Sequence, residues 1–164
     1  LRMILAKNAI LVEGPSDELI VQKAYMNTHD GKLPLENGVD IISVGMSFKR
    51  FLDIAKELQM NVSIITDNDG DYVKNIEKKY ENYMSLPNIR IFYDKDNKAN
   101  TLEPQVIKNN DLKTLNEIFK TSFTNKDSLC EYMRGNKTEY TLKLFNTDKL
   151  FKIPQYIQNA ITQK

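Results

Sequence analysis

The sequence predicts an α/β protein built on a mostly parallel sheet with helices packed against it. Two observations predict this class. Four short apolar runs alternate with longer segments of helical spacing, and most of the runs end in a turn-forming Gly or Asp. Strands that alternate with helices favour parallel pairing, which brings the carboxyl ends of the strands to one edge of the sheet, where ligands bind. A chain of 164 residues with 41% apolar residues suffices for one domain.

The predicted strands cover residues 9–12, 39–44, 62–65 and 89–93, and the first residues of the chain form a strand-like approach. Pro15 suits the first turn of a helix after the first strand. Further helices are expected over residues 48–58, 72–84, 112–119, 128–133, 138–145 and 154–162, with a break at Gly135-Asn136. We therefore expect an α/β core at residues 1–100 and a helical part at 101–164 that packs on it within the same domain.

Charge and cysteine content exclude several functional classes. The 23 basic and 22 acidic residues give a net charge of +1, so any attraction for phosphate must be local. The lone Cys130 cannot form an internal disulfide or a cysteine-based zinc site, and the lone His29 fits a polar residue near a helix end. The chain has no membrane-length apolar run and no signal peptide. It begins at Leu1 rather than Met, which suggests a fragment of a longer cytoplasmic protein.

Acidic residues follow two of the predicted strands. Glu13 ends the first strand, Asp17 follows four residues later, and Asp67 and Asp69 end the third strand. In an extended segment, two residues at this last spacing point the same way. If the first and third strands are neighbours, four carboxylates converge, and such a cluster needs cations or protons to neutralise it. Ligation by oxygen alone favours Mg²⁺ or Mn²⁺ over zinc.

Each of these signals also has a purely structural interpretation. Glu13-Gly14 fits a simple strand-to-turn junction, Asp17 fits a first-turn helix acid, and the segment around Asp67 fits an Asx-rich turn. That segment also resembles the start of a calcium loop, but a strand precedes it and Lys78 stands at the twelfth position. A phosphoacceptor receiver domain has paired acids after its first strand, whereas this chain has a single Glu there. The combination of two acidic clusters at strand ends is more specific than either alone.

Two motifs resemble those of the Toprim family. Leu11-Val12-Glu13-Gly14-Pro15-Ser16-Asp17 resembles its glutamate motif, and Ile64-Ile65-Thr66-Asp67-Asn68-Asp69-Gly70 resembles its DxD motif. The glutamate motif, with an acid four residues after the glutamate, is similar to that of one branch of the family, the OLD (overcoming lysogenization defect) proteins. The resemblance implies a Toprim fold with a mostly parallel four-stranded sheet and a helical C-terminal extension.

Later residues extend the resemblance over nearly the whole chain. Glu103, in Thr101-Leu102-Glu103, resembles the third acidic motif of OLD proteins, and Lys137 matches their late lysine. The simpler interpretations are a helix-start acid for Glu103 and a solvated lysine for Lys137. Several other lysines lie in the same region: Lys126, Lys143 and Lys149. The end of the chain, residues 153–157, also resembles that of OLD proteins.

The resemblance implies a metal-dependent endonuclease that cuts DNA with two Mg²⁺ or Mn²⁺ ions, one activating water and the other stabilising the leaving oxygen. Glu13, Asp17 and Glu103 would surround one ion, with Asp67 and Asp69 near the other, although Glu13 could instead act as a general base. Lys137 would offset charge on the phosphoryl oxygens.

Further implied contacts lie outside this cluster. Lys49 and Arg50 would bind the nucleic-acid backbone, or form a solvated helix face. OLD proteins carry an N-terminal ATPase domain, but this chain has no Walker motif, so ATP would enter only through a domain outside it. The implied partners are DNA, that ATPase domain and, as an option, a second copy of the chain. A ribonuclease M5-like enzyme acting on RNA and a non-catalytic Toprim interaction module remain alternatives.

Overall fold

The computed structural model describes residues 2–162 and contains a four-stranded, all-parallel sheet in the order β2-β1-β3-β4. The α/β class and the position of each strand are confirmed. The described elements, in chain order, are α1 (Arg2–Leu5), β1 (Asn8–Val12), α2 (Pro15–Thr28), η1 (Pro34–Asn37), β2 (Val39–Ser43), α3 (Phe48–Glu57), β3 (Val62–Ile65), η2 (Val73–Lys78), α4 (Glu81–Met84), β4 (Ile89–Phe92), α5 (Leu102–Asn109), α6 (Leu112–Phe119), α7 (Lys126–Gly135), α8 (Lys137–Asn146) and α9 (Gln155–Thr162).

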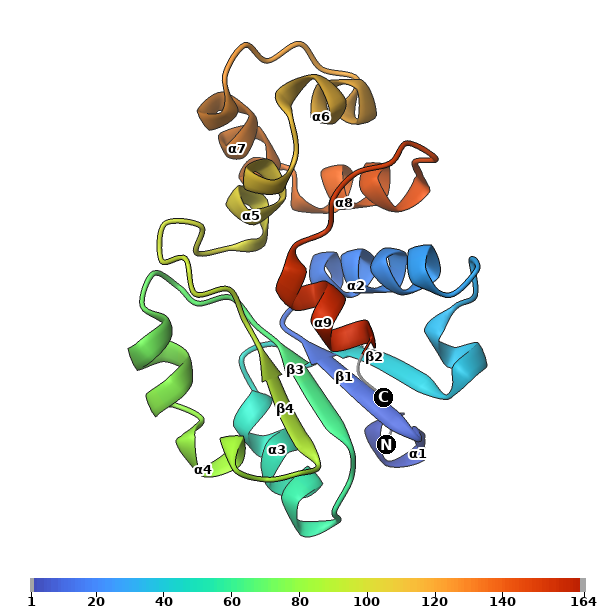
Figure 1. Cartoon of the computed structure of the whole chain (residues 1–164), viewed down its shortest axis with the longest axis vertical. Helices are drawn as coiled ribbons and strands as arrows, with labels where there is room; N and C mark the ends of the chain where they lie inside the picture. The colour runs from blue at the N-terminus through green and yellow to red at the C-terminus, as the bar shows by residue number, and fades with distance from the viewer. Residues whose placement is uncertain (1, 163–164) are drawn as a thin grey trace.

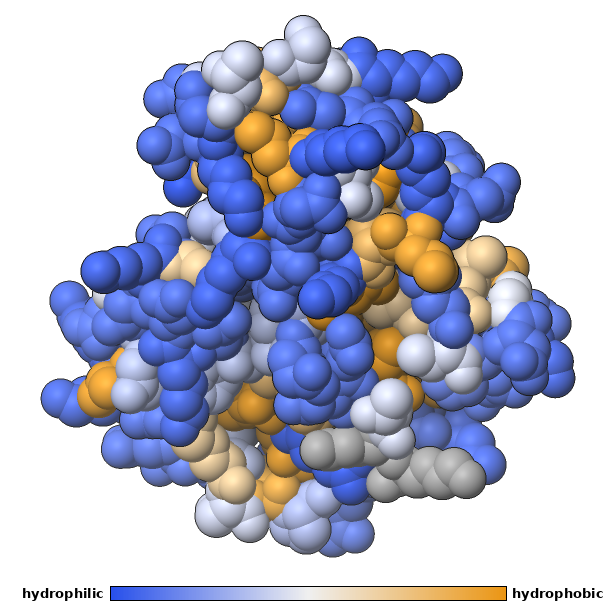
Figure 2. Space-filling model, turned by 45° about the horizontal axis from the view of Figure 1, so that its top comes forward, coloured by the Kyte–Doolittle hydropathy of each residue, from blue (hydrophilic) through white to orange (hydrophobic). Residues whose placement is uncertain are grey.

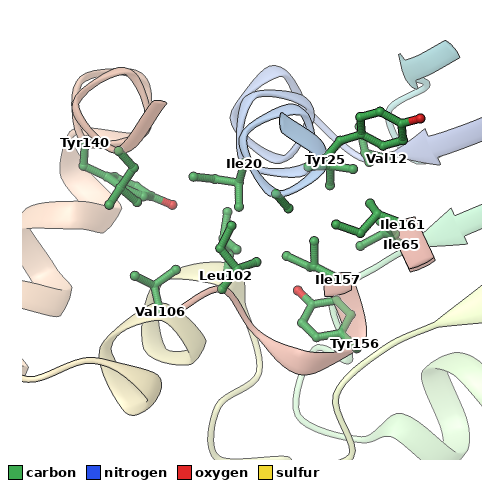
Figure 3. Close-up of a cluster of buried hydrophobic side chains, with 14 of the residues drawn as sticks. Val12, Ile20, Tyr25, Ile65, Leu102, Val106, Tyr140, Tyr156, Ile157 and Ile161 are labelled. Carbon is green, nitrogen blue, oxygen red and sulfur yellow. The ribbon is translucent and has the colours of Figure 1, made fainter. Parts of the chain in front are cut away.

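Both faces of the sheet are buried, which explains why the strands are apolar runs rather than alternating ones. In β1, Ile10 and Val12 join a core with α2 and α5–α9, whereas Ala9 and Leu11 join a second core with α1, α3, η2 and α4. Figure 3 shows part of the first core, in which Tyr156 and Ile157 of α9 lie near Leu102 of α5. The sheet is therefore the middle layer of the molecule.

The C-terminal helices extend the first core beyond the edge of the sheet. Helices α5 to α8 gather above the carboxyl ends of the strands, and α9 returns to lie over the sheet (Figure 1). α8 and α9 both contact α2, and α9 also contacts β3 and β4. This packing leaves a hydrophilic surface with scattered apolar side chains on the face seen in Figure 2. The division at residue 100 remains a prediction.

Two local expectations need correction. The expected strand-like approach is instead the helix α1 within the described residues, while Leu1 lies outside them. Arg2 fastens α1 to the edge strand β2. The Arg2 guanidinium donates to Asp40 Oδ1 at 2.6 Å and to the Ile41 carbonyl at 2.9 Å. The expected helix at 72–84 is divided into the π-helical η2 and the short α4, and the division leaves Tyr80 fully buried.

Helix α5 was not among the expected helices, although the interpretation of Glu103 as a helix-start acid is correct, because Glu103 lies in its first turn. Thr101 is its N-cap residue, and Pro104 falls in its first turn, where proline is tolerated because the amide there has no partner within the helix. These two residues were the signal that could have revealed it. The break at Gly135-Asn136 is confirmed, because Asn136 separates α7 from α8.

Candidate metal and phosphodiester site

The carboxyl ends of β1 and β3 lie side by side, as the site hypothesis required. The two strands pair in parallel, with Leu11 opposite Ile64. Glu13 and Asp67 therefore leave adjacent strands at the same edge of the sheet. Beside them is a cavity of about 160 Å³. Its lining residues are Glu13, Gly14, Pro15, Ser16, Asp17, Asp67, Leu102, Glu103, Lys137 and Tyr140.

Four of the five predicted acids line this cavity, and they come from three separate segments of the chain. Asp17 lies in the first turn of α2, where its Oδ2 accepts a hydrogen bond from the Gly14 amide at 2.9 Å. The interpretation of Asp17 as a first-turn helix acid is thus correct, and the same residue also lines the cavity. Burial, with the charges of Glu13 and Glu103, raises the pKa of Asp17 to about 6.

Asp67 has a strongly raised pKa. Burial is the largest cause of its perturbation, followed by the negative charges of Asp17, Glu103 and Glu13, and together they raise its pKa to about 8. Within residues 2–162, no side chain or amide donates a hydrogen bond to its carboxylate.

Asp69 does not lie beside Asp67 as expected. It is exposed, has a φ of 51°, and is absent from the lining of the cavity. The expectation of an extended segment was wrong because Asn68 turns the chain. Its buried amide donates to the carbonyls of Asp94 at 2.8 Å and Asp96 at 3.0 Å, and its Oδ1 accepts from the Gly70 amide at 2.8 Å. The assignment of Asp69 as a metal ligand stays a prediction.

Asn68 is a positioning residue to which the sequence analysis assigned no role of its own. Its hydrogen bonds fasten the loop after β3 to the loop after β4, and the Asp69 amide adds a bond to the Asn100 carbonyl at 3.2 Å. These two loops carry Asp67 and Glu103 into the same site. No sequence pattern could have revealed this role, because the burial of Asn68, which requires partners for both ends of its amide, appears only in the folded chain.

Glu103 is the most enclosed acid of the site, with 2% of its surface exposed. The Thr101 hydroxyl donates to Oε2 at 2.9 Å, and the Tyr140 hydroxyl donates to Oε1 at 3.2 Å. The Lys137 ammonium lies 3.6 Å from Oε1. Burial and the charge of Glu103 raise the pKa of Tyr140 far above its usual value, so its hydroxyl remains a donor.

Lys137 differs from the other lysines of its region. The Lys126 ammonium donates to the Ile107 carbonyl, the Lys143 ammonium donates to the Phe119 carbonyl, and Lys149 pairs with Glu117. None of these three lines the cavity, whereas Lys137 does, with 60% of its side chain exposed. Its ammonium can therefore reach both Glu103 and a ligand that enters from solvent.

Lys49 and Arg50 lie outside the cavity, on the exposed first turn of α3. The connection that leads to α3 borders the site, because the Gly45 amide donates to the Glu13 carbonyl at 2.9 Å. Their contact with a nucleic-acid backbone stays a prediction. His29 follows the end of α2 and stacks on Tyr25 with ring centroids 3.7 Å apart, as a helix-end residue rather than part of the site.

The chemistry of the site fits a hard divalent cation, although its side chains do not form a finished ligand set. Within residues 2–162, no three acidic, histidine or cysteine side chains are already arranged to hold an ion. Carboxylates that repel one another are expected to stand apart until a cation draws them together. The donors around the cavity are carboxylate and hydroxyl oxygens, which suit Mg²⁺ or Mn²⁺. Side-chain rotation would have to complete the coordination.

Comparisons with known proteins show which proteins this arrangement resembles. Residues 4–69 match the family model described as "Overcoming lysogenization defect protein-like, TOPRIM domain". That range includes Glu13, Asp17, Asp67 and Asp69, whereas Glu103 and Lys137 lie beyond it. No curated protein matches the chain significantly.

Solved structures with the same fold include the C-terminal region of the Xanthomonas campestris pv. campestris OLD protein, at 19% identity and a TM-score of 0.62, over 98% of this chain and 93% of that one. The C-terminal region of the Burkholderia pseudomallei OLD protein has 16% identity and a TM-score of 0.67, over 95% of each chain. At these identities the likeness establishes the fold. Within the described residues no helix is long and apolar enough to cross a membrane. Residues 4–69 thus resemble an OLD-like Toprim domain, and the chain has the fold of the C-terminal region of OLD proteins.

Proposed function

We propose that this chain is a metal-dependent endonuclease that hydrolyses phosphodiester bonds in DNA. The observation that carries the proposal is the convergence of four carboxylates from three segments on one cavity, with Lys137 at its rim. A purely structural protein gains nothing from burying Asp67 without a partner, since an uncompensated buried charge is unfavourable. A divalent cation would remove that cost.

The residues have distinct roles in this proposal. Glu13, Asp17, Asp67 and Glu103 supply the oxygen ligands, and Glu13 acts as a general base if it is not committed to metal. Bound Mg²⁺ or Mn²⁺ would supply an activated water and stabilise charge on the leaving oxygen. Lys137, freed from its 3.6 Å contact with Glu103, would offset negative charge on the phosphoryl oxygens. A second ion, with Asp69 among its ligands, belongs to the same proposal.

Partners follow from the same interpretation. The solved structures that share this fold are C-terminal regions of OLD proteins, which supports an N-terminal ATPase domain as a partner of this chain. Lys49 and Arg50 stand on exposed surface outside the cavity, and in this proposal they bind phosphates of the flanking backbone. Contacts of this kind carry little sequence preference, so we expect cleavage of many sequences.

A plasmid-nicking assay with Mg²⁺ or Mn²⁺ tests the proposal. We expect wild-type protein to nick supercoiled DNA, Asp67→Ala to lose at least about 10²-fold of the rate, and chelation to abolish it, because the site then lacks a ligand or its ion. Asp148→Ala is the matched control, because Asp148 is an exposed acid outside the cavity. Equal nicking by wild type and Asp67→Ala would refute the proposal.

Two alternatives are separated by the same assay. A ribonuclease M5-like activity would cut structured RNA in preference to DNA when both are offered with the same ion. A non-catalytic interaction module would bind metal and cut neither substrate. The receiver-domain alternative loses its support, because residues 4–69 match a Toprim model and the end of β1 carries a single acid.

A further inference from the structure

Tyr140 brings the helical C-terminal part of the chain into contact with the acidic cavity. It lies in α8, one turn after Lys137, and its side chain is fully buried. Phe119 of α6 packs edge-on against its ring, with centroids 6.1 Å apart and an interplanar angle of 73°. In Figure 3 the Tyr140 hydroxyl points from α8 toward the interior. The ring thus has little freedom to move, and the hydroxyl is held in place.

The hydroxyl contacts a group whose orientation decides whether the cavity can hold an ion. Tyr140 donates to Glu103 Oε1 at 3.2 Å, and Thr101 donates to Oε2 at 2.9 Å. Both carboxylate oxygens are therefore fixed, each by one hydroxyl. Lys137 approaches Oε1 at 3.6 Å, but its side chain is 60% exposed and its ammonium can turn toward solvent. Tyr140 is the rigid partner of Oε1.

A buried carboxylate with one oxygen unsatisfied would rotate toward another donor or toward water. Loss of the Tyr140 hydroxyl would leave Oε1 with the mobile Lys137 alone. Hydrogen bonds of this kind, made to a metal ligand by a residue that does not itself touch the metal, set the orientation of that ligand and its affinity for the ion. Tyr140 occupies this position relative to Glu103.

We propose that Tyr140 is a positioning residue that orients Glu103 toward a divalent cation in the cavity. This inference rests on the proposed function, because it assumes that Glu103 binds metal. It also assigns a role to the helical part beyond residue 69, where the family match ends. Helices α6 and α8 would then belong to the metal site as much as the strand ends do, since they fix the ring that holds Glu103.

The test compares Tyr140→Phe with Tyr132→Phe, using Mn²⁺ alone as the probe. Tyr132 belongs to the same aromatic group, 6.5 Å from the Phe119 ring, but its hydroxyl donates to the exposed Glu139. Each variant loses one hydroxyl and keeps its ring. By titration calorimetry we expect the Kd for Mn²⁺ to rise about 10- to 100-fold in Tyr140→Phe, the usual effect of removing such a hydrogen bond. Tyr132→Phe should stay within about twofold of wild type on the same ground.

A second measurement distinguishes positioning from loss of packing. The Mn²⁺ concentration that gives half of the maximal nicking rate should rise by the same factor in Tyr140→Phe, and excess Mn²⁺ should restore most of the rate. A packing defect would instead lower the stability of metal-free Tyr140→Phe far below that of Tyr132→Phe, which urea unfolding in a chelator measures. Wild-type affinity in Tyr140→Phe, or equal weakening in both variants, would overturn the inference and leave the proposed function standing. Wild-type protein that binds no Mn²⁺ would overturn both.

Discussion

Asp67→Asn should stabilise the metal-free protein at neutral pH, because it removes a charge that the fold does not accommodate. The pKa of Asp67 is raised from 3.8 to about 8, chiefly by burial and then by Asp17, Glu103 and Glu13. At 1.36 kcal/mol for each unit of pKa, this raised pKa costs about 4 kcal/mol of folding free energy at pH 7, where the carboxyl must take up a proton on folding. An asparagine amide in the same place is uncharged, but leaving it without partners costs about 1–3 kcal/mol. The expected net gain is about 1–3 kcal/mol.

The sign of the pH dependence follows from the direction of the shift. A carboxyl whose pKa is raised in the folded state favours folding when protonated, so its contribution is most favourable below about pH 4. This stability is lost as the pH rises from about 4 to about 8, after which the charged group costs its full amount. The difference between Asp67→Asn and wild type should therefore be smallest near pH 4 and largest near pH 8.

Urea unfolding of both proteins in the presence of a chelator, at several pH values, measures this difference. In thermal unfolding at pH 8, each kcal/mol of this gain in stability should raise the melting temperature by about 2–4 °C. Asp148→Asn, at an exposed acid, should show no such pH-dependent gain. Added Mn²⁺ should stabilise wild type more than Asp67→Asn, because binding to the folded state alone favours it. A difference between Asp67→Asn and wild type that does not change with pH would refute the reasoning.

Two further predictions concern the groups around Asp67. Lys137→Ala should retain Mn²⁺ binding by calorimetry while its nicking rate falls about 10²–10³-fold, since a donor that acts in the transition state is lost; an unchanged rate would remove Lys137 from the mechanism. Asn68→Ala should lower the free energy of urea unfolding by about 2–4 kcal/mol, because two carbonyls and one amide lose their partner. The same variant should also weaken Mn²⁺ binding, and normal binding would show that the loop after β3 keeps its shape without Asn68.

Local sequence patterns determined the strands and most of the helices. An unbroken apolar run, as at residues 9–12, is typical of a central strand in a parallel sheet that is covered on both faces. The sequence equally predicts that Glu13 ends such a strand and that Asp17 follows four residues later. Periodicity did not reveal the division of the helix at 72–84, and α5 was missed because its Pro104 and short length resemble a loop.

The composition of the cavity depended on packing between distant segments. The sequence by itself determined which acids end the strands, because the apolar run of each strand and the turn residues that end it are neighbours in the chain. Only the tertiary structure decided that Glu103 is enclosed by Thr101 and Tyr140, that Lys137 rather than its neighbouring lysines reaches the cavity, and that Asp69 turns away from Asp67. The physical reason is that such contacts are long-range. The hydrogen bonds of Asn68, for example, join it to residues 26 and 28 positions later in the chain, and no local sequence pattern predicts them.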